Sequence, residues 1–481
     1  MLCQKIERDV SVAPQSRERL ESEIRNPQIL GALAPAPAAY LGGVRRRPSE
    51  LPCSEEDESA WGAVEAWARS GVMALCGRGG GPPLLPPALS IPARLSGIVE
   101  EIERLGSSRA RSGDRAVRLS WEAALAGRAQ LLGLRRRGRV SPNGTCRLLA
   151  TPDGDVALNL PRPDDIELVP ALTETSRAIH DPWEAVTEMA SRMPAGEFVS
   201  RARLLGLAAA VPGERVAEHP YRSTRLAEPR PLATDRSWAV VDLSSLWAGP
   251  LAARVLAESG ARVIKVEDPA RLDGARQNPA FYSWVHPAIE VIARIDFTSS
   301  DGRLELSKML DSADVVIEAS RPRALEQIGL SPEQRGIPPG QIWLSITAHG
   351  RTGAARDWTG FGDDAAVAGG LICRDLDGTA TFCGDAIADP TTGLLAGLAV
   401  LRSLREGGGQ LIEMSLSDVA SWVSGLWGGP PDSDAERVEL VERVEQVEQV
   451  EGSESGWLVR NGHRSVLVAE SPPHVALVQT A

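Results

Sequence analysis

The clearest alternation of apolar and polar positions lies in residues 238–267, WAVVDLSSLWAGPLAARVLAESGARVIKVE. An apolar run at 239–241 precedes the tripeptide AGP at 248–250, and residues 251–256 place Leu, Val and Leu on one helical stripe. A second apolar run follows at 263–264. This order predicts a strand, a loop, a helix and a second strand, the unit from which open parallel sheets are built. Because such sheets bind ligands at the carboxyl ends of their strands, we expect a ligand beside the loop at 248–250.

The first half of the chain carries other periodic patterns. Apolar residues recur at helix spacing in 98–105, and Ser120 is placed to cap a second helix over 121–134. The stretch 143–165 predicts a β-hairpin with its turn at 152–155. Further helices are expected over 164–172, 182–193 and 196–214.

Breaks rich in Pro and Gly divide the chain into five parts. We expect an irregular, partly disordered N-terminal segment, a small α/β domain, a linker, a sheet-and-helix domain and a tail, over residues 1–90, 91–215, 216–236, 237–428 and 429–481. In the tail, Val and Glu repeat every three residues over 436–452, which predicts an exposed helix without chemistry. The stretch 457–470 predicts a closing hairpin.

The composition excludes several function classes. The chain has 481 residues, 43% of them apolar and 24% charged, as in globular proteins. Its net charge of −12 argues against general nucleic-acid binding, since neutralising phosphates needs a basic surface. No apolar run reaches the roughly 18 residues of a membrane span, and the N-terminus lacks a signal-peptide core. The six cysteines show neither metal nor disulfide spacing, so we expect no metal site and a reduced, cytoplasmic location.

Four sequence blocks in the second half carry a more specific signal. The first continues the opening unit with Gly260-Ala261, VIKVE at 263–267, and the pair Asp273 and Arg276. The others are DSADVVIEASRPRALEQIGL, IWLSITAHGRTG and GDAIADPTTGLLAGLAVLRSLREGGGQLIEMSLSDV, at 311–330, 342–353 and 384–419. In this order the blocks resemble the class III CoA-transferases, the CaiB/BaiF family, and four ordered blocks are more specific than a lone glycine motif.

The resemblance implies an α/β fold with a doubly wound, mostly parallel (Rossmann-like) sheet domain and a smaller α/β domain. In the family the small domain lies in the second half of the chain and ends in a helix and a short strand, which residues 196–212 resemble here. The chain therefore looks permuted, with the small domain first, and the alternative is an unrelated front domain. Permutation is tolerated where termini lie close together at the surface.

The resemblance also implies what the protein binds. Its substrates would be an acyl-CoA and a carboxylic acid, with a coenzyme A thioester as substrate and no permanently bound cofactor. Family members form interlocked dimers, so a homodimer is implied, with no nucleic-acid or membrane partner.

Asp389 is the candidate catalytic residue. In the family, an aspartate four residues before a glycine, at the start of a long helix, accepts the acyl group, and Asp389 and Gly393 have this spacing. The residues alone favour another role, because an Asp before Pro390 and an apolar helix is an ordinary helix cap. Both roles are compatible with the positive end of a helix dipole.

The candidate coenzyme A site comprises the AGP tripeptide and three basic residues. The resemblance implies contacts from Ala248, Gly249, Pro250, Lys265, Arg276 and Arg321. Small residues let a backbone approach a ligand, and the Arg fork suits phosphate. The alternatives are a plain turn at the glycine and solvated surface positions for the arginines.

The sequence also departs from the family. Glu290 and Val291 stand where members usually carry a Lys-Arg pair, and an acid there should weaken polyphosphate binding. Gly362 stands where the racemases of this family carry a histidine, which argues against a racemase. We interpret His349, in a different block, as a loop or core histidine.

Three functions compete with CoA transfer. They are CoA-ester racemisation or isomerisation, CoA binding without catalysis, and NAD-dependent chemistry on a Rossmann fold. NAD-dependent chemistry is disfavoured, because the first strand of the sheet domain is not followed by the GxGxxG motif of NAD-binding folds.

Overall fold

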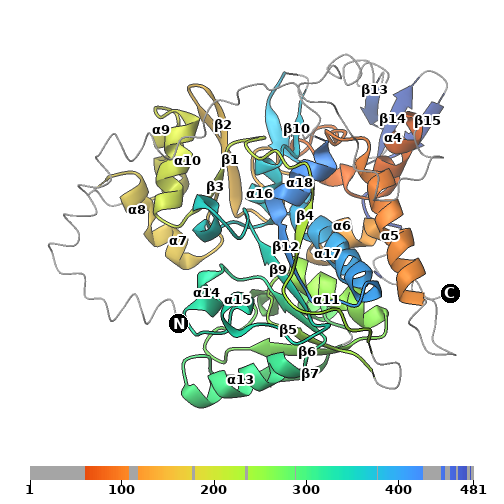
Figure 1. Ribbon diagram of the computed structural model, residues 1–481. Coiled ribbons are helices and arrows are strands. Elements are labelled where there is room, and N and C mark those ends of the chain that lie inside the picture. The colour runs from red at the N-terminus through yellow and green to blue at the C-terminus, as the bar shows by residue number, and fades with distance from the viewer. Residues whose placement is uncertain are drawn as a thin grey trace, which may run out of the picture.

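The computed structural model in Figure 1 describes most of the chain. The described residues are 60–107, 118–175, 179–232, 237–287, 289–375, 377–425, 446–449, 456–461, 464–473 and 477. Among them, no helix is both long enough and apolar enough to cross a membrane.

A mostly parallel sheet forms the centre of the protein and confirms the predicted α/β fold. Its strands lie in the order β4-β12-β9-β8-β5-β6-β7, and all neighbours are parallel except β4 and β12. The strands are β4 (Tyr221–Arg225), β5 (Ala239–Asp242), β6 (Arg262–Glu267), β7 (Ile289–Arg294), β8 (Val315–Glu318), β9 (Ile342–Thr347) and β12 (Gln410–Ser415). Numbered along the chain from β5, the six parallel strands follow the doubly wound order 3-2-1-4-5-6. The order reverses between β5 and β8, where such sheets bind ligands.

Helices cover both faces of this sheet because neighbouring strand residues point to opposite sides. Val240 packs into the core formed by α11 (Ala248–Glu258) and α17 (Ala388–Arg405), whereas Val241 packs into the core of α13 (Ser300–Ser312). Figure 1 shows α13 at the bottom of the view and α11 and α17 on the other side of the sheet. The tripeptide 248–250, predicted as a loop, forms the first turn of α11 instead.

Helices α11 and α17 cross closely and run in the same direction. A Cβ at Gly393 would lie 2.8 Å from the Ala248 carbonyl oxygen, and one at Gly397 would lie 2.6 Å from a Val255 methyl carbon. Residues later in α17 contact residues later in α11, so the two helices run in the same direction and both begin at the same edge of the sheet. Since α11 follows β5, this edge is the carboxyl end of the parallel strands.

A small α/β unit precedes the large sheet in the chain. Strands β1 (Cys146–Thr151), β2 (Gly154–Asn159) and β3 (Ala208–Ala210) form an antiparallel sheet, which confirms the predicted hairpin. One face of this sheet packs on the helices α8 (Val169–Leu172), α9 (Pro182–Ala190) and α10 (Ala195–Leu204), and α7 (Pro163–Glu167) precedes α8. The other face packs on residues of α16 (Gly362–Ala368) and of the hairpin β10 (Ile372–Arg374) and β11 (Ala380–Phe382).

In the described part of the chain, four helical elements precede the small unit, and the last two of them pack on α17. They are α4 (Ala60–Arg69), η2 (Met73–Leu75), α5 (Ile91–Ser107) and α6 (Trp121–Leu132). Ser120 caps α6 as predicted, since its side chain accepts the Ala123 N–H. Residues 60–90 of the predicted irregular segment are therefore folded, with Trp67 and Cys76 fully buried, while residues 1–59 lie outside the described part.

Two other predicted segments differ from the structure. The predicted linker 216–236 contains β4, which pairs with β12 as the antiparallel edge of the sheet. Within the predicted helix 436–452, Gln446–Gln449 forms strand β13, and the rest lies outside the described residues. β13 pairs with β14 (Trp457–Asn461), which pairs with β15 (Arg464–Leu467), so the predicted closing hairpin is present. The remaining elements are η3 (Gly274–Gln277), α12 (Pro279–Val285), α14 (Arg323–Glu326), α15 (Pro332–Arg335), η4 (Ala354–Asp357) and α18 (Leu416–Ser424).

The close crossing of α11 and α17 should make Gly397 sensitive to substitution. In Gly397→Ala, the new methyl group would overlap Val255, and we expect a loss of about 1–3 kcal/mol in the free energy of unfolding. Gly196→Ala in α10 is the matched control, because a Cβ there meets nothing within 4 Å. Urea unfolding followed by circular dichroism measures both, and equal stability of the two variants would contradict the close packing.

Candidate functional site

Two strained turns lie at the starts of α11 and α17. Leu246 has φ +70° and Ala386 has φ +43°, left-handed values that non-glycine residues rarely adopt. Each of these residues stands two positions before the first residue of its helix. The N–H of Leu246 donates to Asp273 Oδ1, and that of Ala386 donates to Asp363 Oδ1, both at 2.9 Å. Strain of this kind collects at functional sites, where the surrounding structure enforces it.

The turn before α11 rests on a buried ion cluster around Lys265. The Lys265 ammonium lies 3.2 Å from Asp242 and 3.3 Å from Asp273, and it donates to the Ser244 carbonyl oxygen. Burial raises the pKa of Asp273, but the His286 ring, the Lys265 charge and two backbone N–H groups lower it more, so it lies well below its usual range. Lys265 is itself fully buried, so it supports the turn and exposes no charge to a ligand.

Asp389 lies in the first turn of α17 and is partly exposed. The helix is capped by Ile387 without a side-chain hydrogen bond, so Asp389 does not act as the cap that its sequence context favours. Within the described part of the chain, its carboxylate makes no hydrogen bond or ion pair. Burial raises the pKa of Asp389 to about 7, the Arg128 charge opposes this rise, and the nearby carboxylates of Asp363, Asp364 and Asp385 add to it.

The acids next to Asp389 are buried and their pKa values are also raised. Burial, with the repulsion of Asp385, raises the pKa of Asp363 to about 6. Burial also raises the pKa of Asp364 to about 7, although Asn159 and a backbone N–H stabilise its charge. Such a group of carboxylates in a low-dielectric environment raises the pKa values of its members toward neutrality.

Side chains from the front of the chain hold this acidic cluster. Asn143 donates to Asp363 at 2.7 Å, and Asn159 donates to Asp364 at 2.9 Å. Three further contacts involve Arg128 of α6, which lies 3.2 Å from Asp385 and stacks over the rings of Trp247 and Phe281. Sequence analysis missed these residues because their acidic partners stand more than 200 positions away along the chain.

Gly362 leaves the space beside the Asp389 carboxylate without a side chain. A Cβ at Gly362 would overlap Asp389 Oδ2. Gly362 stands where the racemases of this family carry a histidine, so this position is adjacent to Asp389. His349 lies beside Asp364 on the buried side of the acidic cluster and is a core histidine, one of the two interpretations of the sequence. It is 4% exposed, packs edge-on against Trp358, and lies 4.0 Å from Asp364. Burial, with repulsion from Arg203 and Arg215, lowers its pKa to about 3, so it is neutral.

The other candidate coenzyme A residues lie on different elements. Ala248, Gly249 and Pro250 are buried in α11, where a Cβ at Gly249 would overlap Ser244. Arg276 makes a two-pronged ion pair with Glu267 and donates to the Tyr282 hydroxyl at 2.7 Å. Arg321 is partly buried just after β8. The side chain of Glu290 is outside the described part, and Val291 is 41% exposed on β7.

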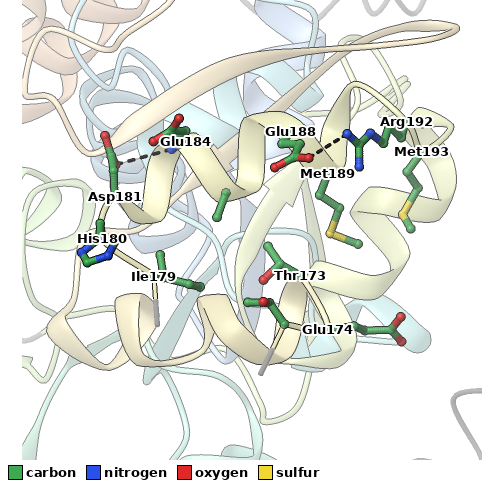
Figure 2. A pocket seen from close by; sticks show the side chains of 12 residues that line it. Thr173, Glu174, Ile179, His180, Asp181, Glu184, Glu188, Met189, Arg192 and Met193 are labelled. Carbon is green, nitrogen blue, oxygen red and sulfur yellow. Dashed lines mark hydrogen bonds and ion pairs between the residues drawn. The ribbon is translucent and has the colours of Figure 1, made fainter. Parts of the chain in front are cut away.

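A surface groove of about 560 Å³ lies between α8 and α9 in the small unit (Figure 2). Figure 2 shows Asp181, Glu184 and Glu188 along one side, with Glu188 paired to Arg192. None of the site residues predicted from the sequence lines this groove.

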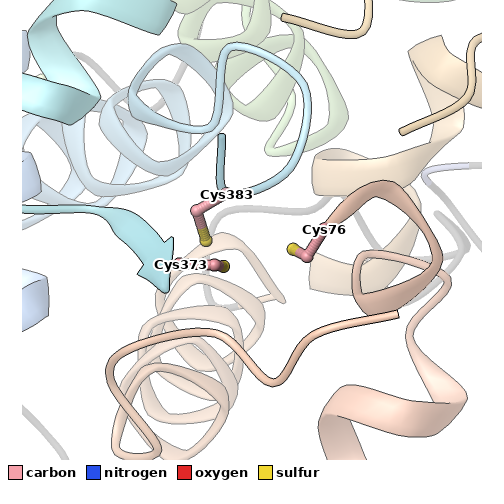
Figure 3. Close-up of side chains that lie close together, drawn as sticks. All are labelled: Cys76, Cys373 and Cys383. Atoms are coloured by element: carbon pink, nitrogen blue, oxygen red, sulfur yellow. The ribbon is translucent and has the colours of Figure 1, made fainter. Parts of the chain in front are cut away.

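Cys76 lies beside two cysteines from the second half of the chain, Cys373 and Cys383, in the interior of the protein (Figure 3). The sulfur atoms of Cys76, Cys373 and Cys383 all lie within 4.8 Å of one another, and all three residues are buried. Their spacing of 297 and 10 positions gave no signal in the sequence.

The raised pKa values make stability pH-dependent in a defined direction. The folded chain keeps protons on Asp364 that the unfolded chain loses near pH 4, so the free energy of unfolding falls as pH rises from 4 to 7. The slope is up to about 1.4 kcal/mol per pH unit for each such group. In Asp364→Asn, we expect a shallower fall over this range and higher stability than wild type at pH 8.

Urea unfolding at pH values from 4 to 8 tests this expectation. Asp357→Asn is the control, because Asp357 is half-exposed and lies 3.9 Å from Arg323. Parallel stability curves for wild type and Asp364→Asn would show that Asp364 keeps an ordinary pKa in the folded chain.

Comparisons with known proteins agree with the geometry. Residues 237–432 match the model of CoA-transferase family III. Succinyl-CoA–D-citramalate CoA-transferase of Chloroflexus aurantiacus is 33% identical over 202 residues, 39% of this chain and 50% of that protein. Succinate–glutarate CoA-transferase of Agrobacterium fabrum is 32% identical over 205 residues, 38% of this chain and 51% of that protein.

Among solved structures, a CAIB/BAIF family protein from Brucella suis aligns with 48% of this chain and 66% of its own, at 26% identity and a TM-score of 0.40. The chain spans about half the length of the curated relatives that it matches. The strand order, the turn before α17 and the match to CoA-transferase family III all fall in the same part of the chain.

Proposed function

We propose that the protein is an acyl-CoA:carboxylate CoA-transferase in which Asp389 is the nucleophile. The observation that carries the proposal is the Asp389 carboxylate itself. It is partly exposed in the first turn of α17, has no hydrogen bond within the described part of the chain, and lies in the segment that matches CoA-transferase family III.

The reaction proceeds through two covalent states of Asp389. A carboxylate oxygen attacks the thioester carbonyl carbon, the C–S bond breaks, and a mixed anhydride and CoA thiolate form. The thiolate attacks the aspartyl carbonyl and releases the first carboxylic acid, which leaves an aspartyl-CoA thioester. The acceptor carboxylate then attacks this thioester and forms a second anhydride. The returning thiolate attacks the acyl carbonyl, which releases the new acyl-CoA and restores Asp389.

The surroundings of Asp389 suit this chemistry. Only the ionised carboxylate attacks, and a pKa of about 7 leaves a substantial ionised fraction at neutral pH. Partial burial removes water that would otherwise weaken the nucleophile. The N-termini of α11 and α17 begin at the same edge of the sheet, and the positive ends of the two helix dipoles can stabilise the oxyanion that forms during each attack.

Coenzyme A would enter at the carboxyl ends of β5 and β8. The first turn of α11 would contact the ligand through Ala248, Gly249 and Pro250, and the backbone N–H groups of Ala248 and Gly249 are the donors in it, since proline has none. Arg276 and Arg321 would contact the phosphates at the nucleotide end, and Arg276 can keep its pairing with Glu267 while doing so. Lys265 positions the turn before α11 through its buried ion pairs rather than by touching coenzyme A.

The remaining features follow from the same proposal. The substrates are a CoA thioester and a carboxylic acid, and no permanently bound cofactor is needed. Succinyl-CoA is the first donor to test, because the relative from Chloroflexus aurantiacus is named for it. We further propose a permuted chain with the small domain at 91–215, a homodimer and a cytoplasmic location.

Racemisation of a CoA ester is less well supported than transfer. A racemase needs a second acid–base group facing the substrate carbon from the other side. Gly362 supplies no side chain beside Asp389, and His349 is buried against Trp358.

The test of the proposal is a mass measurement on Asp389. After incubation with succinyl-CoA and other acyl-CoAs, we expect a covalent aspartyl-CoA adduct, which hydroxylamine converts to a hydroxamate on the peptide containing Asp389. Asp389→Asn should lose adduct formation and at least about 10³-fold in transfer rate, because an amide is a very poor nucleophile.

Asp357→Asn serves as the matched control and should keep both the adduct and the rate, since Asp357 lies on η4 at the surface. Normal turnover in Asp389→Asn would contradict the proposal. So would an adduct located on another peptide.

Arg128 should tune the nucleophile through charge. Its guanidinium lowers the pKa of Asp389, so Arg128→Gln should raise that pKa and shift the acidic limb of the kcat–pH profile to higher pH by about one unit. At pH 9, kcat should approach the wild-type value. Arg405→Gln, at the exposed end of the same helix, should leave the profile unchanged, and a pH-independent loss of activity in Arg128→Gln would oppose this role.

A further inference from the structure

The three-cysteine cluster joins two parts of the chain that are distant in sequence. Cys76 caps the C-terminal end of η2, Cys373 lies on β10, and Cys383 follows β11 directly. Figure 3 shows the three side chains converging from these elements. They are 0%, 1% and 3% exposed, so their sulfur atoms face one another away from solvent.

Cys146, the fourth free cysteine in the described residues, provides a comparison with a single buried thiol. Cys146 on β1 is also fully buried, but it packs among apolar residues of the small sheet with no second sulfur in its group. Burial alone therefore does not explain why three other cysteines meet, since a single buried cysteine packs as a small apolar residue.

A cationic side chain is anchored beside Cys76. The Arg136 guanidinium acts on the Cys76 sulfur through its charge, and the Cys76 thiol donates to the Val72 carbonyl oxygen at 3.4 Å. Arg136 is held in place by the carbonyl oxygens of Ala74 and Gly81, at 3.1 and 2.6 Å. Three thiolates around a divalent ion carry a net charge of −1, which the single charge of Arg136 balances.

We propose that Cys76, Cys373 and Cys383 bind a zinc ion as three thiolates. Zn–S bonds are about 2.3 Å long, so sulfur atoms at most 4.8 Å apart would each need to move inward by no more than about 0.5 Å to reach a common ion between them. Binding releases the three thiol protons to solvent, and a water completes the four ligands that zinc prefers.

The ion would fasten the front of the chain to the turn that carries Asp389. Cys76 belongs to the segment before α5, whereas Cys383 stands directly before the turn of Gly384 and Ala386. Val72, four residues before Cys76, lies 3.4 Å from the position of a Cβ at Gly384. Zinc bound here is a structural ion, and its role does not depend on the reaction proposed for Asp389.

The metal content of the full-length protein tests the proposal. Protein purified without chelator from cells grown with added zinc should contain about one zinc per chain by inductively coupled plasma mass spectrometry. X-ray absorption at the zinc edge should show three sulfur ligands and one lighter ligand. Cys76→Ser, Cys373→Ser and Cys383→Ser should each lower the zinc content at least tenfold and lower the thermal midpoint, whereas Cys146→Ser should keep the zinc.

Three results would overturn the assignment. The first is a wild-type protein without zinc whose six cysteines all react as free thiols after denaturation. The second is a wild-type mass two units low, which marks a disulfide. The third is zinc with fewer than three sulfur ligands. These measurements use wild-type protein and stay decisive even if a serine variant fails to fold.

Discussion

The geometry of the site depends on two backbone N–H groups held by buried carboxylates. Leu246 and Ala386 adopt left-handed backbone, which costs a non-glycine residue on the order of 1–3 kcal/mol. Asp273 and Asp363 offset this cost by accepting the two N–H groups at 2.9 Å. Because the strained turns lead directly into α11 and α17, these acids fix where both helices begin. The two first turns are thereby held at one edge of the sheet.

The acid that supports the second turn depends on the front of the chain. Asp363 accepts from Asn143, and Asp385, one residue before Ala386, pairs with Arg128. A buried carboxylate without such partners would have to take up a proton or admit water. The front half therefore contributes to the electrostatics around Asp389 and does more than cover α17.

The sequence predicts those features that arise from local pattern. The alternation at 238–267 and the hairpin at 146–159 predict their elements because side-chain periodicity follows directly from strand and helix geometry. The edge strand β4 escaped prediction because its side chains are mostly exposed, so no alternation marks it. The contacts from Asn143 and Arg128 and the meeting of Cys76 with Cys383 have no local signal. They exist because the front of the chain packs onto α16 and α17, and sequence spacing does not record that contact.

The sequence around Asp389 favours a helix cap, which the structure does not show. An aspartate followed by proline at the start of an apolar helix favours a cap, because the short carboxylate can accept the next free N–H groups. The helix begins one residue before Asp389, however, since Ala386 turns the chain early and Ile387 takes the cap position. Asp389 is thus carried into the first turn, with Gly362 beside it and Arg128 as a nearby positive charge. A carboxylate freed from capping by a strained turn three residues earlier, with its pKa near neutrality, supports the role of nucleophile better than that of helix cap.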